Sequence, residues 1–100
     1  MLAIRYSQAA KVDLQDIGHY LETRMGKAGA RVWLKRIRAR AQALKLDGPS
    51  FREREELGPG RRAVNVGPWM IFYRISNGTL LVQRILRGSR QIRPELLDEC

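Results

Sequence analysis

Apolar and polar residues follow two different periods along the chain, and each period predicts one type of element. At the start, Leu2, Ile4 and Tyr6 alternate with Ala3 and Arg5, which predicts a short half-buried strand over residues 1–6. Apolar residues then recur every three or four positions, as one face of a helix requires, at Ala10, Leu14, Ile17 and Leu21 and again at Ala30, Trp33, Leu34, Ile37, Ala41 and Leu44.

The signals that start and stop helices divide this second region into two. Ser7 precedes the first helical stretch and is a suitable N-cap. The segment 25–29 carries two glycines and interrupts the pattern, and Asp47-Gly48-Pro49 ends the second stretch. We therefore expect residues 7–46 to form two helices joined as a hairpin, with apolar faces that the later strands must cover.

Three strands are predicted for residues 61–86. Gly67-Pro68 separates the first two apolar runs, and Asn77-Gly78 separates the second from the third, as in a two-residue hairpin turn with positive φ at both positions. The last run is apolar on both faces except at Gln83 and Arg84, which is typical of a central strand. We expect residues 50–60 to be a charged surface connection and residues 87–100 a C-terminal tail. The fold predicted is α+β in the order β-α-α-β-β-β, a helical hairpin on a mostly antiparallel sheet.

Length and composition exclude several classes of protein. One hundred residues suffice for a single domain, residues 1–100, and no apolar run approaches the roughly 20 residues of a membrane span. The N-terminus lacks the apolar segment of a signal peptide, so a cytoplasmic location is expected. His19 and Cys100 are the only histidine and the only cysteine, and the sequence has no P-loop, dinucleotide-binding glycine pattern or nucleophile elbow. We therefore expect no metal, no cofactor and no assigned catalytic residue.

The positive charge is concentrated in one segment. Of the net charge of +9, residues 23–46 contribute eight cations and no acid, whereas the segments before and after are close to neutral. Such a field attracts a polyanion or an acidic protein, although a solvated helix face is the alternative interpretation.

Arginines supply the remaining candidate chemistry. Guanidinium groups bind phosphate or carboxylate bidentately and stay charged at any biological pH. The candidates for contact with a target lie at the borders of the predicted strands: Arg61, Arg62, Arg84, Arg87 and Arg90. A structural role is the alternative for Arg84 and for Arg74, which carboxylates such as Asp16 or Glu55 could hold. The same alternative stays open for Arg87 and Arg90.

Certain motifs resemble those of the RelE/ParE superfamily, the toxins of bacterial type II toxin–antitoxin systems. Residues 10–17 with Tyr20 resemble the first helix of the family, residues 57–62 and 66–74 resemble the ParE branch around its glycine-proline and aromatic-arginine motifs, and residues 84–90 resemble the ending of its last strand. The resemblance runs in register over residues 3–93.

The resemblance implies two alternative activities. RelE-like members cut messenger RNA in the ribosome with basic residues and a tyrosine or histidine near the C-terminus, whereas ParE-like members inhibit DNA gyrase. This chain has no tyrosine or histidine after Tyr73, and Arg87 stands where the family has histidine. Because arginine is a poor general acid or base, the ParE-like activity is favoured. Arg87 and Gln91 depart from the family ending and leave open whether this copy is toxic.

The resemblance also implies a cognate antitoxin, a partner that usually lays an acidic amphipathic tail over its toxin. We expect Arg31, Lys35, Arg38 and Lys45 to line part of that contact. A third alternative is a non-toxic module whose basic helix binds nucleic-acid phosphates.

Overall fold

A computed structural model describes residues 2–88 and confirms the α+β fold. The elements in chain order are β1 (Ala3–Tyr6), α1 (Gln8–Asp47), single 3₁₀ turns at Gly48–Ser50 and Glu55–Leu57, β2 (Arg61–Val66), β3 (Trp69–Ser76) and β4 (Thr79–Arg87). The predicted tail therefore begins too early, because Arg87 is the last residue of β4.

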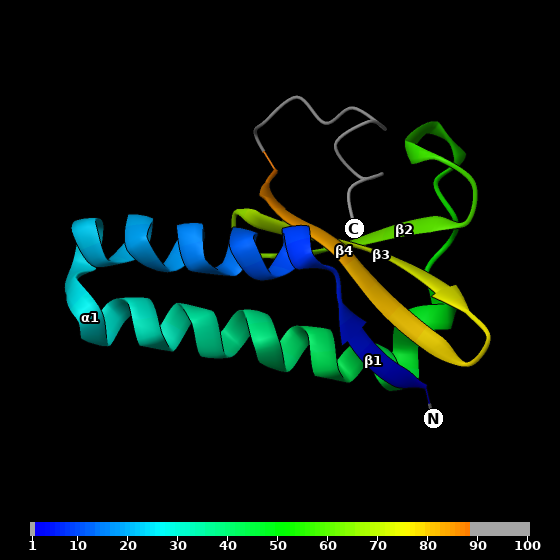
Figure 1. Ribbon diagram of the computed structural model, residues 1–100, viewed down its shortest axis with the longest axis horizontal. Helices are drawn as coiled ribbons and strands as arrows, with labels where there is room; N and C mark the ends of the chain where they lie inside the picture. Colours follow the sequence, from blue (N-terminus) through cyan, green and yellow to red (C-terminus); the bar gives the residue numbers. More distant parts are fainter. Residues whose placement is uncertain (1, 89–100) are drawn as a thin grey trace.

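The two predicted helices are one element that turns back at a single residue. Ser7 caps α1 as predicted, accepting a hydrogen bond from Ala10 N at 3.0 Å. Only Gly26 has non-helical angles, φ 80° and ψ 174°, so the break is narrower than the segment 25–29. The first arm (residues 8–25) and the second arm (residues 27–47) run antiparallel (Figure 1). Within residues 2–88, no helix combines the length and the apolar character needed to cross a membrane.

The four strands form one sheet in the order β1-β4-β3-β2. β1 runs parallel to β4, and the other two pairings are antiparallel. Asn77 and Gly78 both have positive φ, 51° and 74°, so the predicted two-residue turn joins β3 to β4. The prediction of a central position for the last apolar run is confirmed, since β4 pairs with β1 on one side and β3 on the other.

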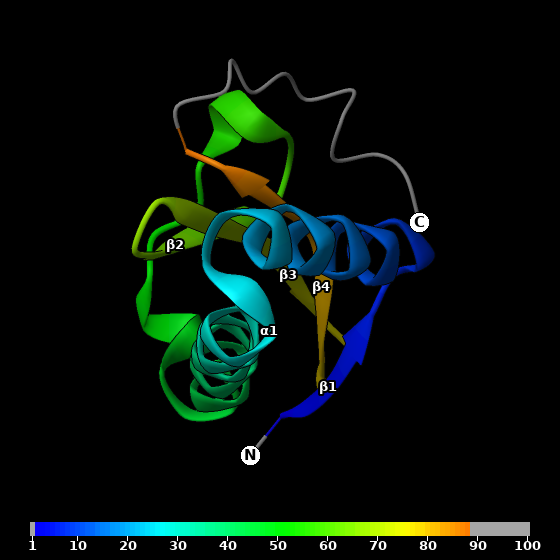
Figure 2. The same cartoon turned by 90° about the vertical axis from the view of Figure 1, so that its left-hand side faces the viewer.

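Both arms of α1 cover the same face of the sheet (Figure 2), and the main core lies between these two layers. The arms contribute the apolar residues that their helical spacing predicted. The fully buried members of this core on α1 are Ala10, Ile37, Ala41 and Leu44, and those on the strands are Ile71, Tyr73, Leu80 and Val82.

A smaller cluster covers the opposite face of the sheet. Phe72 and Leu86 point away from the helices because neighbouring strand residues alternate between faces. Leu57, from the connection between α1 and β2, packs against them and is 5% exposed. The connection over residues 50–60 is therefore more than a surface loop, since it covers part of this face.

Candidate functional site

Arg87 stands at the end of β4 in contact with two aromatic rings. Trp69 begins β3 directly opposite Arg87, and Tyr20 comes from the first arm of α1. The guanidinium carbon lies 5.7 Å from the Tyr20 ring centre and 5.6 Å from the Trp69 ring centre, and Nη1 donates a hydrogen bond to the Tyr20 hydroxyl at 3.3 Å. The two rings meet edge to face at 6.1 Å. These contacts hold an exposed cation in one orientation.

The surroundings of Arg87 form a shallow pocket of about 320 Å³, which we call the Arg87 pocket. Its lining combines apolar side chains with carboxylates from the first arm: Asp13, Asp16, Ile17, Tyr20, Trp69, Ile85, Leu86 and Arg87. A second cation, Arg24, lies over the Tyr20 ring at 5.1 Å. The pocket therefore presents aromatic and apolar surface together with charges of both signs, the guanidinium groups of Arg87 and Arg24 and the carboxylates from the first arm, which suits recognition of a protein surface.

Arg84 is bound to the fold through Asp13, a residue that the sequence pattern does not single out. Its Nε and Nη2 donate to the two oxygens of Asp13 at 2.8 and 2.9 Å, and the same carboxylate accepts from Ile85 N at 2.9 Å. β1 pairs with β4 only over Thr79–Val82, so Asp13 provides the edge of β4 with an acceptor beyond the end of β1. Arg84 thus has the structural role given above as its alternative, but its partner is Asp13 and not Asp16 or Glu55.

Three further arginines hold the connection that precedes β2. Each donates to a backbone oxygen of that connection: Arg61 Nη1 to Leu57 O at 2.5 Å, Arg62 Nε to Phe51 O at 2.7 Å, and Arg74 Nη2 to Pro59 O at 2.8 Å. Arg61 is 4% exposed, and Arg62 also pairs with Glu53 at 3.6 Å. Of the five arginines predicted to meet a target, the described residues thus place Arg87 in the exposed pocket and give Arg61, Arg62 and Arg84 contacts within the fold. Arg90 lies outside the described residues.

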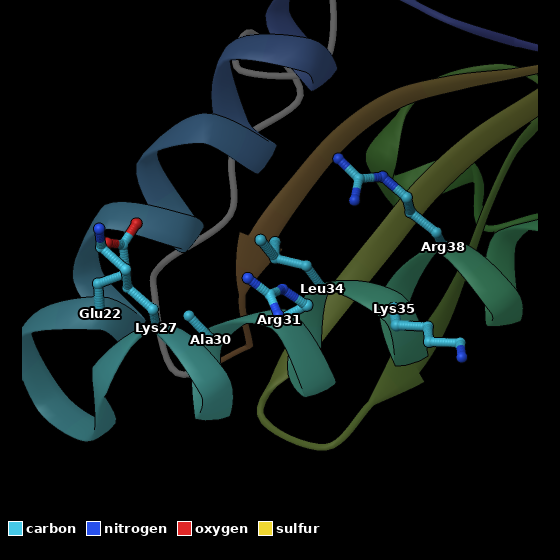
Figure 3. Close-up of a pocket in the computed structure, with 7 residues that line it drawn as sticks. All are labelled: Glu22, Lys27, Ala30, Arg31, Leu34, Lys35 and Arg38. Carbon is cyan, nitrogen blue, oxygen red and sulfur yellow. The ribbon is translucent and has the colours of Figure 1, made fainter.

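The cations predicted to meet an antitoxin lie mostly together. A hollow of about 610 Å³, the arm groove, lies between the two arms near their turn (Figure 3), and its lining is Glu22, Lys27, Ala30, Arg31, Leu34, Lys35 and Arg38. Lys45 does not line it and lies near β1, where its carbonyl accepts from Leu2 N. The groove offers four cations and one acid around two apolar side chains.

A second hollow extends the arm groove along the first arm. The two share Glu22, Leu34 and Arg38, and the extension adds Lys11, Leu14, Gln15, Gly18 and His19. The arms approach closely here because Gly18 has no side chain: a Cβ on it would lie 3.3 Å from Leu34 Cδ1. His19 is exposed and forms part of this wall.

Comparison with known proteins agrees with this architecture. The model of a family described as the ParE toxin of the type II toxin–antitoxin system parDE matches residues 4–92. The chain belongs to the ParE toxin family. A curated relative of this ParE-family chain, Toxin ParE3 of Caulobacter vibrioides, is 36% identical over 45 residues, so the match spans 45% of each chain.

Solved structures show the same fold at lower identity. A chain of the chromosomal ParDE system of P. aeruginosa superposes with a TM-score of 0.79 at 20% identity, covering 87% of the ParE-family chain and 96% of its own length. A chain of the RelBE2 toxin–antitoxin complex of Mycobacterium tuberculosis gives a TM-score of 0.62 at 19% identity, with coverage of 86% and 96%. Both likenesses concern the fold.

The side chain of Tyr73 in this ParE-family chain, with its hydroxyl group, is enclosed by the main core. It is 0% exposed and donates to Gly48 O at 2.7 Å. Burial raises the pKa of Tyr73 to about 12, with Arg62 opposing and Asp47 reinforcing the change. The last tyrosine in the sequence therefore has no access to a bound substrate.

Two residues of the Arg87 pocket are not identified as site residues by the sequence pattern. In the sequence, Tyr20 is recognised only as part of a first-helix motif, and Trp69 only as part of a predicted strand. The available signal in the sequence is the position of Tyr20 outside the apolar stripe, which places its ring at the surface of the helix; in the structure Tyr20 is 38% exposed. The meeting of both rings with Arg87 depends on the strand register, which the sequence alone does not provide.

Proposed function

We propose that this ParE-family toxin inhibits DNA gyrase or a related topoisomerase in the bacterial cytoplasm and is neutralised by a cognate antitoxin. The alternative is a ribosome-dependent ribonuclease, which must take a proton from a 2′-hydroxyl and give one to the leaving oxygen. The observation that favours gyrase concerns Tyr73, Arg84 and Arg87, the residues of β3 and β4 that such proton transfer would use. None of the three is suited to it.

On β3 and β4, no side chain is suited to proton transfer. Tyr73 is buried with a raised pKa, and the chain has no tyrosine or histidine after it. Arg84 is engaged by Asp13, and the guanidinium group of Arg87 is a poor general acid or base. A guanidinium held against Tyr20 and Trp69 suits recognition of a surface better than acid–base catalysis, so we assign the Arg87 pocket to target binding.

The proposed target contact is tested with Arg87→Ala and a matched control. Arg36→Ala also removes a guanidinium stacked on an indole, because Arg36 lies 4.3 Å from the centre of the Trp33 ring, outside the Arg87 pocket. In a supercoiling assay with purified gyrase, we expect Arg87→Ala to lose at least about tenfold in inhibition, the loss of about 1.4 kcal/mol that one charged contact supplies, and Arg36→Ala to retain it.

Induction of the wild-type chain in bacteria separates the two targets. Gyrase inhibition predicts early loss of supercoiling or accumulation of cleaved DNA while protein synthesis continues. Early arrest of protein synthesis with cleaved messages and unaffected gyrase would instead establish the ribonuclease. Duplex binding with strong salt dependence and no growth arrest would favour the non-toxic nucleic-acid-binding module.

We assign the antitoxin contact to the arm groove. Ala30 and Leu34 offer an apolar strip, and Lys27, Arg31, Lys35 and Arg38 surround it with positive charge. An amphipathic helix or extended segment with acidic borders matches both features. The solved ParDE and RelBE2 assemblies with the same fold support a protein partner of this kind.

Charge reversal tests this assignment. The double variant Arg31→Glu with Lys35→Glu should weaken the complex with the cognate antitoxin at least about tenfold and reduce its dependence on salt. Reversal of Arg52 and Arg54, on the connection before β2, changes the net charge equally and lies outside the groove. Equal losses in both variants would show an effect of net charge alone and would remove the groove from the proposal.

A further inference from the structure

A cationic hollow at the β1 edge of the sheet is separate from the Arg87 pocket and takes no part in the function proposed above. Its volume is about 520 Å³, and we call it the edge hollow. The residues that line it come from the start of the chain and from the two central strands: Arg5, Tyr6, Ser7, Gln8, Lys11, Arg74, Ser76, Thr79 and Leu81.

Three cations from three elements meet this hollow. Arg5 of β1 is opposite Leu81 of β4, which is in turn opposite Arg74 of β3. Residues opposite one another share a sheet face, so Arg5 and Arg74 stand on the same face two strands apart, about 10 Å between Cα atoms. Lys11 joins them from the first turns of α1, whose N-terminus carries partial positive charge.

The charge of the edge hollow is not compensated within the fold. None of the residues that line it is an acid, and among residues 2–88 neither Arg5 nor Lys11 has a side-chain hydrogen bond or an ion pair. By contrast, arginines 40, 54, 62 and 84 each pair with a carboxylate. Arg74 is held in place by its bond to Pro59 O, so one cation of the hollow is already oriented.

We propose that the edge hollow binds phosphodiester groups of a nucleic-acid backbone. Positive side chains beside the hydroxyls of Ser76 and Thr79 supply N–H and O–H donors, which are what phosphate oxygens accept. The spacing of the cations allows contact with neighbouring phosphates of one strand. Apolar surface does not distinguish this hollow from the arm groove, because Tyr6 and Leu81 line it as Ala30 and Leu34 line the groove. The hydroxyl donors of Ser76 and Thr79 are what favour phosphate over an acidic amphipathic peptide.

The test measures binding of a fluorescein-labelled DNA duplex of arbitrary sequence to the full chain at several salt concentrations. The variant Arg5→Ala with Lys11→Ala removes two exposed cations of the hollow. It should bind more weakly, and the slope of log K against log salt should flatten by about 2, one unit for each phosphate that is no longer neutralised. The matched control, Arg52→Ala with Arg54→Ala, removes the same number of cations from the connection before β2, outside both the edge hollow and the arm groove, and should keep the slope.

Polyglutamate is measured with the same variants as a probe for an acidic protein. Three results would overturn the proposal: a wild-type chain that does not bind the duplex, equal slope changes in the two double variants, or an edge-hollow variant that loses polyglutamate binding and keeps duplex binding. The last would assign the hollow to an acidic protein. Circular dichroism of each variant verifies the fold. Since the assay contains neither gyrase nor antitoxin, its result is independent of the toxin function proposed above.

Discussion

Asp13 is the residue that hydrogen-bonds the edge of β4 beyond the end of β1. Its side chain is 8% exposed and accepts three hydrogen bonds, two from Arg84 and one from Ile85 N. Removing Asp13 takes the acceptor from Ile85 N and both carboxylate bonds from Arg84, and the loss of one partner of a buried pair typically costs about 3–5 kcal/mol. We expect Asp13→Ala to lower the free energy of unfolding by about 3 kcal/mol or more.

Urea unfolding measures this loss, and Asp16→Ala is the control. Asp16 lies about one helical turn later and is exposed, so its removal should change the free energy of unfolding by less than about 0.5 kcal/mol. A loss of similar size in both variants would contradict the role given to Asp13.

Tyr73 gives a second test at the level of one residue, and this one depends on pH. Tyr73→Phe removes the buried hydroxyl donor to Gly48 O and leaves that oxygen the longer bond from Phe51 N at 3.4 Å. The change should cost about 1–2 kcal/mol at neutral pH. The folded-state pKa of about 12 exceeds the ordinary tyrosine pKa of 10.0, so the unfolded chain releases the proton first. The stabilisation is therefore complete below pH 10 and decreases as the pH rises toward 12.

The measurement is urea unfolding at neutral pH and across this alkaline range. Wild-type stability should fall by at most about 1.4 kcal/mol per pH unit through this group, and Tyr73→Phe should fall less steeply. Tyr6, whose pKa burial also raises, remains in both proteins and contributes equally. Identical alkaline slopes would show that the Tyr73 hydroxyl titrates in the same way in the folded and unfolded chains.

Single residues were the hardest feature to predict from the sequence. Asp13 and Asp16 are both polar positions of the first helix, and nothing local distinguishes them. The difference arises because β1 ends at Tyr6 while β4 continues to Arg87, which leaves Ile85 N for a side chain to satisfy. Tertiary contacts also account for Arg61 and Arg62, which resemble surface cations in the sequence but donate to backbone carbonyls in the fold.

Among the elements, α1 depends on Gly26 for its reversal. The φ of 80° and ψ of 174° at this position belong to a region that only glycine occupies readily. A Cβ at Gly26 would meet no atom within 4 Å, so any cost of Gly26→Ala comes from the backbone alone. We expect a loss of about 1–3 kcal/mol in urea unfolding.

Gly29→Ala serves as the comparison for the same substitution in a helix. Gly29 has helical geometry, and its added methyl would meet the Met25 side chain, which is exposed and can move. The gain in helix propensity should offset much of that contact, so the change should stay well below the loss at Gly26. A larger loss at Gly29 than at Gly26 would mean that packing at the turn, and not its backbone angles, holds the two arms.

The elements themselves were largely predictable, because periodicity, caps and turn residues are local signals. The central position of β4 followed from its apolar character on both faces, and the Asn77-Gly78 turn from its sequence. Strand order was beyond reach: β1 lies parallel to β4, and no local pattern specifies which later strand it meets. The packing of Leu57 on Phe72 is not predicted either, because Leu57 lies in an otherwise charged segment that was expected to be a surface connection.

At the scale of the whole molecule, the turn of α1 projects beyond the sheet (Figure 1). Residues 22–28 are all exposed, whereas each arm closer to the sheet contributes residues to the main core. Hydrogen exchange follows local opening, which is easiest where few apolar contacts oppose it. We therefore expect the amides of residues 22–28 to exchange fastest within α1 and those of β4 between Leu80 and Val82 to exchange slowest in the sheet.

Antitoxin binding should slow amide exchange at the turn of α1, which we expect to exchange fastest in the free chain. The arm groove begins at this turn, with Glu22 and Lys27 among its lining, so an antitoxin seated there would slow exchange in residues 22–35 while the Arg87 pocket at the end of β4 stays unchanged. The complex carrying Arg31→Glu and Lys35→Glu should lose that protection at the same partner concentration. Protection confined to β4 and Tyr20 would instead place the antitoxin over the proposed target surface, which would make neutralisation a direct competition with gyrase.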